Sequence, residues 1–268
     1  LDGEIGQTEL FGGTVDWSSF EIRNPKGLIT MDGSDYDGDN PAELIDESSS
    51  SYVSTNPSHL RSLQTKRYIE RLSGAIQDIE AIEDIILARK KMEEYFDVPS
   101  LLLYWIITFV VYHIDGVWKN WIWLIYNGVA SPSFYDMDSI FGRHWNGTYI
   151  IDGSQYAVFP ADVIAAPMYS MINRLCREEM CGMYAELRDN EVISTKSIMA
   201  EVYKWIERVG TEAYKRNLDK WNNIPSYRTA KSLEDGTAEG GMFDSPLRVA
   251  KWVEKRMPMV DKFFGYVS

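Results

Sequence analysis

The sequence has only two cysteines and three histidines among its 268 residues, which limits the metal and redox chemistry that it can support. Cys176 and Cys181 are five residues apart in a region with helical periodicity, so they point to different faces and do not favour a disulfide. Neither has the histidine or cysteine neighbours that complete a structural zinc site. We therefore expect two free, mostly buried thiols.

Long hydrophobic runs are also missing. The longest, "PSLLLYWIITFVVY" at residues 99–112, has 14 residues, whereas a bilayer-spanning helix needs about 20. It predicts a buried core helix. The chain begins with Leu1 and has neither an initial Met nor an apolar leader, so we expect a fragment or a processed product.

Positive charge is scarce. The chain has 27 Lys and Arg against 40 Asp and Glu, for a formal net charge of −13. This balance argues against nucleic acid as a partner, because phosphate neutralisation needs basic side chains. It also argues against an anionic membrane surface. It suits a protein kept soluble by its charge, or one that handles cations or basic substrates.

Aromatic residues, in contrast, are abundant, with 9 Trp, 16 Tyr and 10 Phe, and they can supply a large core. Residues 1–30 predict short strands and turns, and residues 31–58 an acidic surface loop. Apolar residues recur at helical spacing over 59–96 and again in the segments that follow residue 161. Between these regions, Asn127-Gly128 predicts a β-hairpin. We expect one domain over 1–268, of α+β class and mainly helical, with a small central β-hairpin.

Four acids in the acidic loop have the spacing of positions 1, 3, 5 and 12 of a calcium-binding loop: Asp35, Asp37, Asp39 and Asp46. The sixth position, however, is Asn40 instead of Gly, and the twelfth is Asp instead of Glu. No suitable flanking helices are predicted. The pattern therefore favours a solvated acidic loop over a calcium site.

Three polar residues interrupt the most hydrophobic part of the chain in a meaningful order. Asp115 is followed five residues later by Asn120, and Asp136 comes after the predicted hairpin. Phosphoryl transfer needs one carboxylate to orient and deprotonate the attacking hydroxyl, and a carboxylate and an amide to hold divalent metal. Protein kinases carry these groups in the same order. The spacing alone also suits a turn at Asp115-Gly116 and a strand-edge role for Asn120, but the acids at the strand end suit cations better than packing.

The segments "HIDGVWKNWIWLIY" and "FYDMDSIFG" resemble the core of the spore-coat CotH kinase family. The similar features are Asp115, the pair Lys119-Asn120, the Asp136-Met137-Asp138 motif and Phe141-Gly142. Weaker similarity extends outward over roughly residues 15–264, including "FEIRNPKG" and the closing helices.

This resemblance implies an atypical protein-kinase-like C-terminal lobe that uses ATP and Mg²⁺ or Mn²⁺ to phosphorylate Ser of coat or surface proteins. It implies Asp115 as the catalytic residue and Asn120 and Asp136 as metal ligands, with Asp138 as a helper. Coat or virion proteins are the implied partners, and a spore coat, cell surface or virion the implied location.

The nucleotide-covering lobe of a kinase has no clear counterpart in the sequence. "LFGGT" at residues 10–14 has two glycines and reads more readily as a turn, and Lys26 reads as a surface lysine. We expect the lobe to precede Leu1 in the family, so that this chain corresponds to the C-terminal two-thirds. The alternative is a non-catalytic structural component of a phage virion or of a spore or surface layer, built on the same scaffold.

Overall fold

The computed structural model describes residues 9–10, 13–14, 17–22, 52–53, 63–113, 116, 121–142, 167–210, 212, 213, 216, 219, 220 and 246–267. They form an α+β structure that is mainly helical, as the sequence predicts. The chain divides into two compact units. The sheet unit comprises Leu1–Thr108, Ile114–Met137 and Pro160–Met180, and the helical unit comprises Phe109–His113, Asp138–Phe159 and Cys181–Ser268. That the whole chain is one domain stays a prediction.

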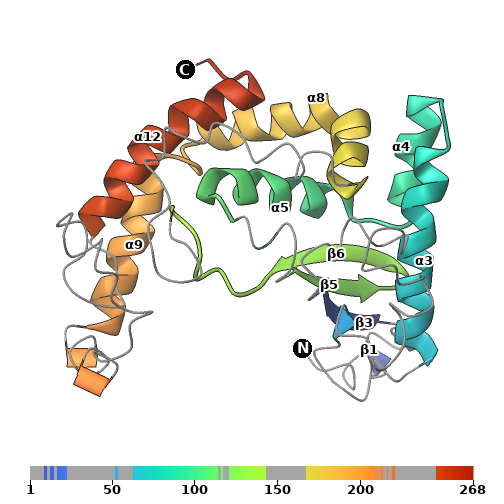
Figure 1. The fold of residues 1–268 in the computed structure, drawn as a ribbon, viewed down its shortest axis with the longest axis horizontal. Coiled ribbons are helices and arrows are strands. Elements are labelled where there is room, and N and C mark those ends of the chain that lie inside the picture. The colour runs from blue at the N-terminus through green and yellow to red at the C-terminus, as the bar shows by residue number, and fades with distance from the viewer. Residues whose placement is uncertain are drawn as a thin grey trace, which may run out of the picture. The chain divides into compact units, whose positions relative to one another are not determined.

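The sheet unit is built on a four-stranded antiparallel sheet with strand order β4-β3-β5-β6 (Figure 1). Its strands are β3 (Trp17–Ile22), β4 (Tyr52–Val53), β5 (Trp121–Tyr126) and β6 (Val129–Phe134), and a separate pair is formed by β1 (Glu9–Leu10) and β2 (Gly13–Thr14). The predicted hairpin is confirmed. Asn127 and Gly128 have φ of 48° and 80°, the left-handed geometry of a type I′ turn.

The outer edge of β6 is covered by the linker that leads into helix α5 (Val98–Val111). The Ala130 amide donates to the Tyr95 carbonyl at 2.8 Å, and the Asp97 amide donates to the Ala130 carbonyl at 2.9 Å. The Asp97 carboxylate accepts from the hydroxyls of Ser100 at 2.6 Å and Ser131 at 3.2 Å. Asp97 therefore fixes the first turn of α5 beside β6.

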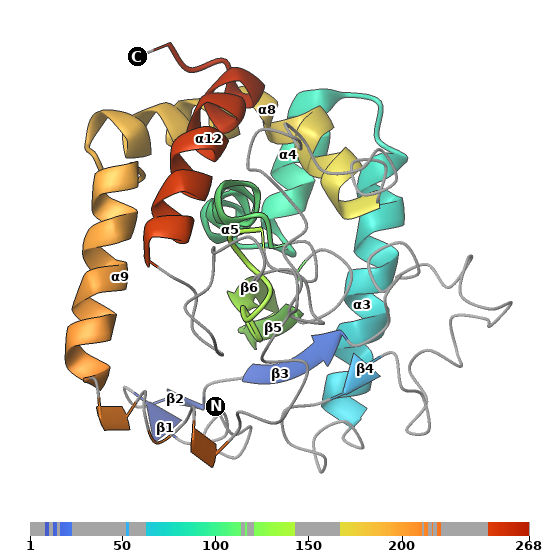
Figure 2. The same cartoon turned by 60° about the vertical axis from the view of Figure 1, so that its left-hand side comes forward.

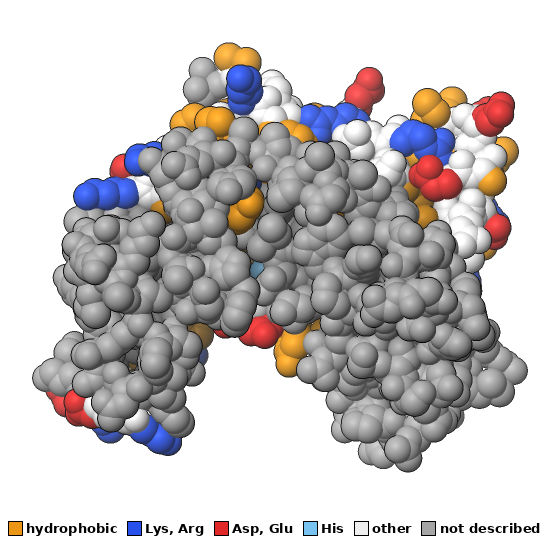
Figure 3. All heavy atoms as spheres, in the orientation of Figure 1, with side chains coloured by type: hydrophobic (Ala, Val, Ile, Leu, Met, Phe, Trp, Pro, Cys, Tyr) orange, Lys and Arg blue, Asp and Glu red, His pale blue; other side chains and the backbone are white. Residues whose placement is uncertain are grey.

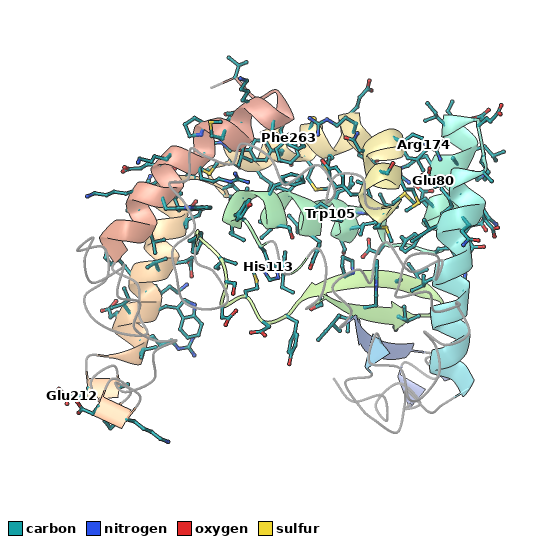
Figure 4. All side chains as sticks on the ribbon, viewed as in Figure 1. Glu80, Trp105, His113, Arg174, Glu212 and Phe263 are labelled. Atoms are coloured by element: carbon teal, nitrogen blue, oxygen red, sulfur yellow. The ribbon has the colours of Figure 1, made fainter. Side chains whose placement is uncertain are left out.

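Helices α3 (Leu63–Glu80) and α4 (Ile85–Glu93) lie side by side in the sheet unit (Figures 1 and 2). Asp84 caps α4 by accepting from the Leu87 amide at 3.0 Å. Arg174 of helix α8 (Pro167–Asp189) closes the end of α3. It donates to the carbonyls of Ile79 at 3.1 Å and Ile82 at 3.3 Å. Figure 4 shows Arg174 and Glu80 pointing toward one another, with Nε 3.5 Å from Oε1.

Helix α5 is the buried core helix that the apolar run predicts. Leu101, Leu102, Trp105 and Ile106 have no exposed surface. The Trp105 ring packs edge-on against Tyr169 of α8, with a centroid separation of 5.0 Å. Burial on nearly all sides explains why the run has no polar stripe.

Helices α9 (Thr195–Val209) and α12 (Pro246–Phe264) pack against each other in the helical unit (Figure 2). α9 begins with a capping box in which Ser194 and Ser197 each satisfy the other's backbone amide. The rings of Tyr184 on α8 and Phe264 on α12 stack with centroids 4.4 Å apart. All three helices were predicted from apolar periodicity.

The surface of the sheet unit is not uniformly polar. Ile85, Ile86 and Leu87, at the start of α4, are 55%, 83% and 56% exposed. In the space-filling view, hydrophobic side chains lie among acidic and basic ones at the upper right, where α4 begins (Figure 3). The first turn of α4 therefore contributes little to the core.

Part of the predicted acidic loop is ordered into the sheet. Tyr52 and Val53 form β4 and pair with Ile22 and Glu21 of β3. Two residues are too few to show a period-two pattern, so this strand has no signal in the sequence. The rest of residues 31–58, including the calcium-loop acids, lies outside the described residues.

The two thiols are free, as expected, with Cys176 buried and Cys181 half-buried. Within the described ranges, no helix combines the length and the apolar character needed to cross a bilayer.

Candidate functional site

The candidate catalytic segment is described only in part. Asp115, Lys119 and Asn120 lie outside the described residues, whereas Asp136 and Asp138 lie within them.

In the sheet unit, Tyr104 contacts both segments that carry the candidate residues. Its hydroxyl donates to the Gly116 carbonyl at 2.8 Å, and Gly116 directly follows Asp115. Its ring stacks on Phe134, with centroids 4.5 Å apart and planes 18° apart. Phe134 is the last residue of β6, two residues before Asp136. The Tyr104 side chain thus contacts both Gly116, the neighbour of Asp115, and Phe134, at the end of the strand that precedes Asp136.

Tyr104 is well suited to hold these segments in fixed positions. The side chain is only 2% exposed, and it projects from the rigid core helix α5. Burial raises the pKa of its hydroxyl, so the phenol stays protonated and keeps donating to Gly116. The phenol therefore remains a hydrogen-bond donor at neutral pH and above.

Asp136 has an unusual backbone conformation. It is exposed, and its φ is 50°, in the left-handed region. Aspartate tolerates this region better than most residues, because its short side chain bonds locally. The left-handed residue ends the extended course of β6 and turns the chain into the Asp136-Met137-Asp138 motif.

In the helical unit, the residues that follow Asp138 are joined to the end of α5. The Phe141 amide donates to the Val111 carbonyl at 2.8 Å, and the Phe141 ring packs edge-on against Trp252 of α12 at 5.7 Å. Val111 precedes Asp115 by four residues, and Phe141 follows Asp138 by three. Within this unit, the end of α5, which precedes the candidate catalytic segment, is therefore hydrogen-bonded to the residues that follow the Asp136-Met137-Asp138 motif.

Positive φ at non-glycine residues recurs, along the sequence, beside the candidate segments. Among the described residues there are five, and three of them are Tyr112, Asp136 and Phe141, with φ of 58°, 50° and 54°. A left-handed aromatic residue costs about 1–2 kcal/mol. Such residues persist where surrounding contacts over-determine them, which is typical of functional sites.

The remaining polar residues near the motif have simple surroundings. Asp138 is exposed and accepts from the Ser139 hydroxyl at 2.9 Å, and Ser139 is 3% exposed. His113, labelled in Figure 4, is fully buried at the end of the segment that leaves α5. His144 lies outside the described residues.

The chemistry of the donor set suits a hard divalent cation. Carboxylate and amide oxygens are the ligands that Mg²⁺ and Mn²⁺ take, and both Asp136 and Asp138 are exposed. Within the described part of the chain, no group of three or more His, Cys, Asp or Glu side chains converges as a metal cluster. The full predicted ligand set also includes Asn120, so the described residues contain only part of it.

A family model described as CotH kinase protein matches residues 21–259. Because this match covers most of the chain, the chain belongs to the CotH kinase protein family. No curated protein and no solved structure matches the chain. The family assignment confirms the resemblance seen in the sequence and supports a spore-coat kinase-like domain as the coarse class of function.

Proposed function

We propose that this chain is the catalytic-type lobe of an atypical protein kinase that transfers phosphate from ATP to Ser of coat or surface proteins. Membership of the CotH kinase protein family supports the class. The order of Asp115, Asn120 and Asp136 supports the roles. The observation that carries the proposal is Tyr104, whose hydroxyl bonds beside Asp115 and whose ring stacks two residues before Asp136.

The proposed roles follow from the chemistry of phosphoryl transfer. The Asp115 carboxylate orients the acceptor Ser hydroxyl and takes its proton, while the Ser oxygen bonds to the γ-phosphorus and the bond from that phosphorus to the ADP oxygen breaks. Asn120, Asp136 and Asp138 would hold Mg²⁺ or Mn²⁺, and the ion would neutralise the charge of the phosphates. Asp136 and Asp138 are exposed, so they are accessible to a metal–nucleotide complex.

The second candidate is a non-catalytic structural component of a phage virion or of a spore or surface layer. It is favoured because residues 10–14, "LFGGT", match a phosphate-binding loop only weakly. In this case the Asp136-Met137-Asp138 motif would not bind a metal–nucleotide complex.

The test measures both steps on the full chain. Transfer is followed with γ-labelled ATP and Mg²⁺ or Mn²⁺, using dephosphorylated casein as a general Ser acceptor, and ATP binding is measured by calorimetry. We expect Asp115→Ala to lower transfer by about 100-fold or more, as for loss of a general base, while ATP binding is kept. We expect Asp136→Ala to weaken Mn²⁺-dependent ATP binding by about tenfold or more.

Asp78→Ala is the matched control, because Asp78 is an exposed acid on α3, outside the proposed site. It should leave both transfer and binding unchanged. If the unaltered chain neither transfers phosphate nor binds ATP with either metal, the kinase proposal is wrong and the structural role is favoured. If Asp78→Ala and Asp115→Ala have equal effects, the assigned role of Asp115 is wrong.

A further inference from the structure

The helical unit contains an arginine in its interior. Arg256 of α12 is 1% exposed and is among the largest fully buried side chains. Burying a charged group away from water is costly unless strong hydrogen bonds compensate. The contacts that its guanidinium makes therefore indicate what the residue is for.

Two of these contacts go to a single carbonyl on α5. Arg256 Nε and Nη2 donate to the Phe109 carbonyl oxygen at 3.1 Å and 2.7 Å. Phe109 lies two residues before the last residue of α5, so its carbonyl belongs to the last turn of the helix. A cation at this end is also favoured by the helix dipole.

The next contact is made where the chain leaves α5. The Arg256 guanidinium carbon lies 5.1 Å from the centroid of the Tyr112 ring, within the range of a cation–π interaction. Tyr112 has φ of 58° and is the residue that turns the chain out of the helix. Arg256 thus contacts both the last turn of α5 and the left-handed residue that follows it.

The Phe141 amide completes the arrangement by donating to the Val111 carbonyl at 2.8 Å. Two carbonyls of the last turn of α5 are therefore bonded to partners distant in sequence, one on α12 and one after the Asp136-Met137-Asp138 motif. Burial lowers the pKa of Arg256 to about 10, so the guanidinium is still charged at neutral pH.

We propose that Arg256 is a positioning residue: by bonding the Phe109 carbonyl and contacting Tyr112, it sets the path of the chain as it leaves α5, up to His113. Asp115 follows His113, the last described residue of this path, by two positions. The consequence for catalysis depends on the proposed function, whereas the effect on the path of the chain does not. Misplacing a catalytic group by about 1 Å can cost about 100-fold in rate.

The test uses Arg256→Lys in the full chain, because lysine keeps the charge but not the planar fork that bonds one carbonyl twice. Arg188→Lys is the matched control. Arg188 is also a partly buried arginine that bonds α12, through Asp261, but it makes no bond to α5. Both variants are first compared for thermal stability, and later measurements are made well below either melting temperature.

The first readout is hydrogen exchange followed by mass spectrometry. In Arg256→Lys we expect the peptides that cover residues 109–116 and the Phe141 amide to exchange about tenfold faster or more, because bonds from a charged donor are lost. Arg188→Lys should leave these peptides unchanged. Equal exchange of them in the two variants would overturn the proposal, and this readout decides it whether or not the chain transfers phosphate.

The second readout is the kinetics of transfer. In Arg256→Lys we expect kcat to fall by about 10–100-fold with KM for ATP unchanged, and the combination with Asp115→Ala to be no slower than Asp115→Ala alone. Restored kcat in Arg256→Ala on addition of millimolar guanidinium would support the role, while an unchanged kcat in Arg256→Lys would contradict it. Absence of transfer by the unaltered chain would refute the proposed function and leave the exchange result to decide the positioning role.

Discussion

Asp261 of α12 is the centre of a polar network in the helical unit, and removing its carboxylate is the most informative test of how this unit is held together. Its Oδ1 accepts from the Tyr184 hydroxyl at 2.6 Å and from Arg188 Nε at 2.8 Å, and its Oδ2 accepts from Arg188 Nη2 at 3.1 Å. Arg188 Nη1 also donates to the Ile193 carbonyl at 2.7 Å. One carboxylate therefore links α12 to α8 by three bonds.

The expected magnitude follows from burial. The side chains of Arg188 and Asp261 are 16% and 17% exposed, so solvent replaces little of what Asp261→Ala removes. Breaking a buried ion pair on one side costs about 3–5 kcal/mol, and partial exposure places this pair at about 3 kcal/mol. Burial, the hydrogen bond to Asp261 and the Asp261 charge raise the pKa of Tyr184, so its phenol remains a donor that the variant leaves unsatisfied.

The assay is urea unfolding followed by circular dichroism, with thermal melting alongside. We expect Asp261→Ala to lower the unfolding free energy by about 3 kcal/mol and the melting temperature by about 6 °C or more. The control is Glu201→Ala on α9, whose partner Lys204 is 3.1 Å away while their side chains are 64% and 69% exposed. This exposed pair should change stability by less than about 0.5 kcal/mol.

A double-mutant cycle with Arg188→Met isolates the pair itself. We expect a coupling energy of about 1–3 kcal/mol between Arg188 and Asp261, because the two bonds are parallel and partly desolvated. The reasoning is refuted if Asp261→Ala and Glu201→Ala differ by less than about 1 kcal/mol. It is also refuted if the coupling energy is indistinguishable from zero.

Further predictions concern two glycines and the two thiols. Gly128→Ala should destabilise by about 1–2 kcal/mol, since φ is 80° and the new Cβ would collide with Nη1 of Arg71, which donates to the Gly128 carbonyl. Gly74→Ala, inside α3 with nothing within 4 Å of the new Cβ, should stabilise by roughly 0.5–1 kcal/mol; urea unfolding of both variants distinguishes the two effects, and equal signs would contradict the argument. Burial raises the pKa of Cys176 from 9.0 to about 11, so at pH 8 its thiolate fraction is roughly 100-fold lower, and iodoacetamide should alkylate the half-buried Cys181 first. Mass spectrometry of the alkylated peptides checks this order, which should disappear in urea. The raised pKa of Cys176 also makes the unfolding free energy fall as pH rises from about 9 to about 11, because the thiol of the unfolded chain ionises first. Equal labelling rates in the folded protein would show that Cys176 is accessible.

Local patterns in the sequence determined the elements of this protein. The type I′ turn follows from Asn127-Gly128, because these two residues adopt positive φ at little cost and set the register of β5 and β6. The helices follow from apolar periodicity, and burial of α5 follows from a run with no polar face. The CotH family could also be recognised from the sequence, because the order and spacing of Asp115, Asn120, Asp136 and Phe141-Gly142 are local features.

The contacts that bring the site segments together were decided only by the tertiary structure. In the sequence Tyr104 is one aromatic residue of an apolar run, and nothing local shows that its hydroxyl bonds Gly116 while its ring stacks on Phe134. Arg256 likewise looks like a solvated charge on an amphipathic helix, whereas in the structure it is buried and donates to the Phe109 carbonyl, 147 residues away in sequence. Such partners are chosen by packing between distant elements, which leaves no periodic or spacing signal in the chain.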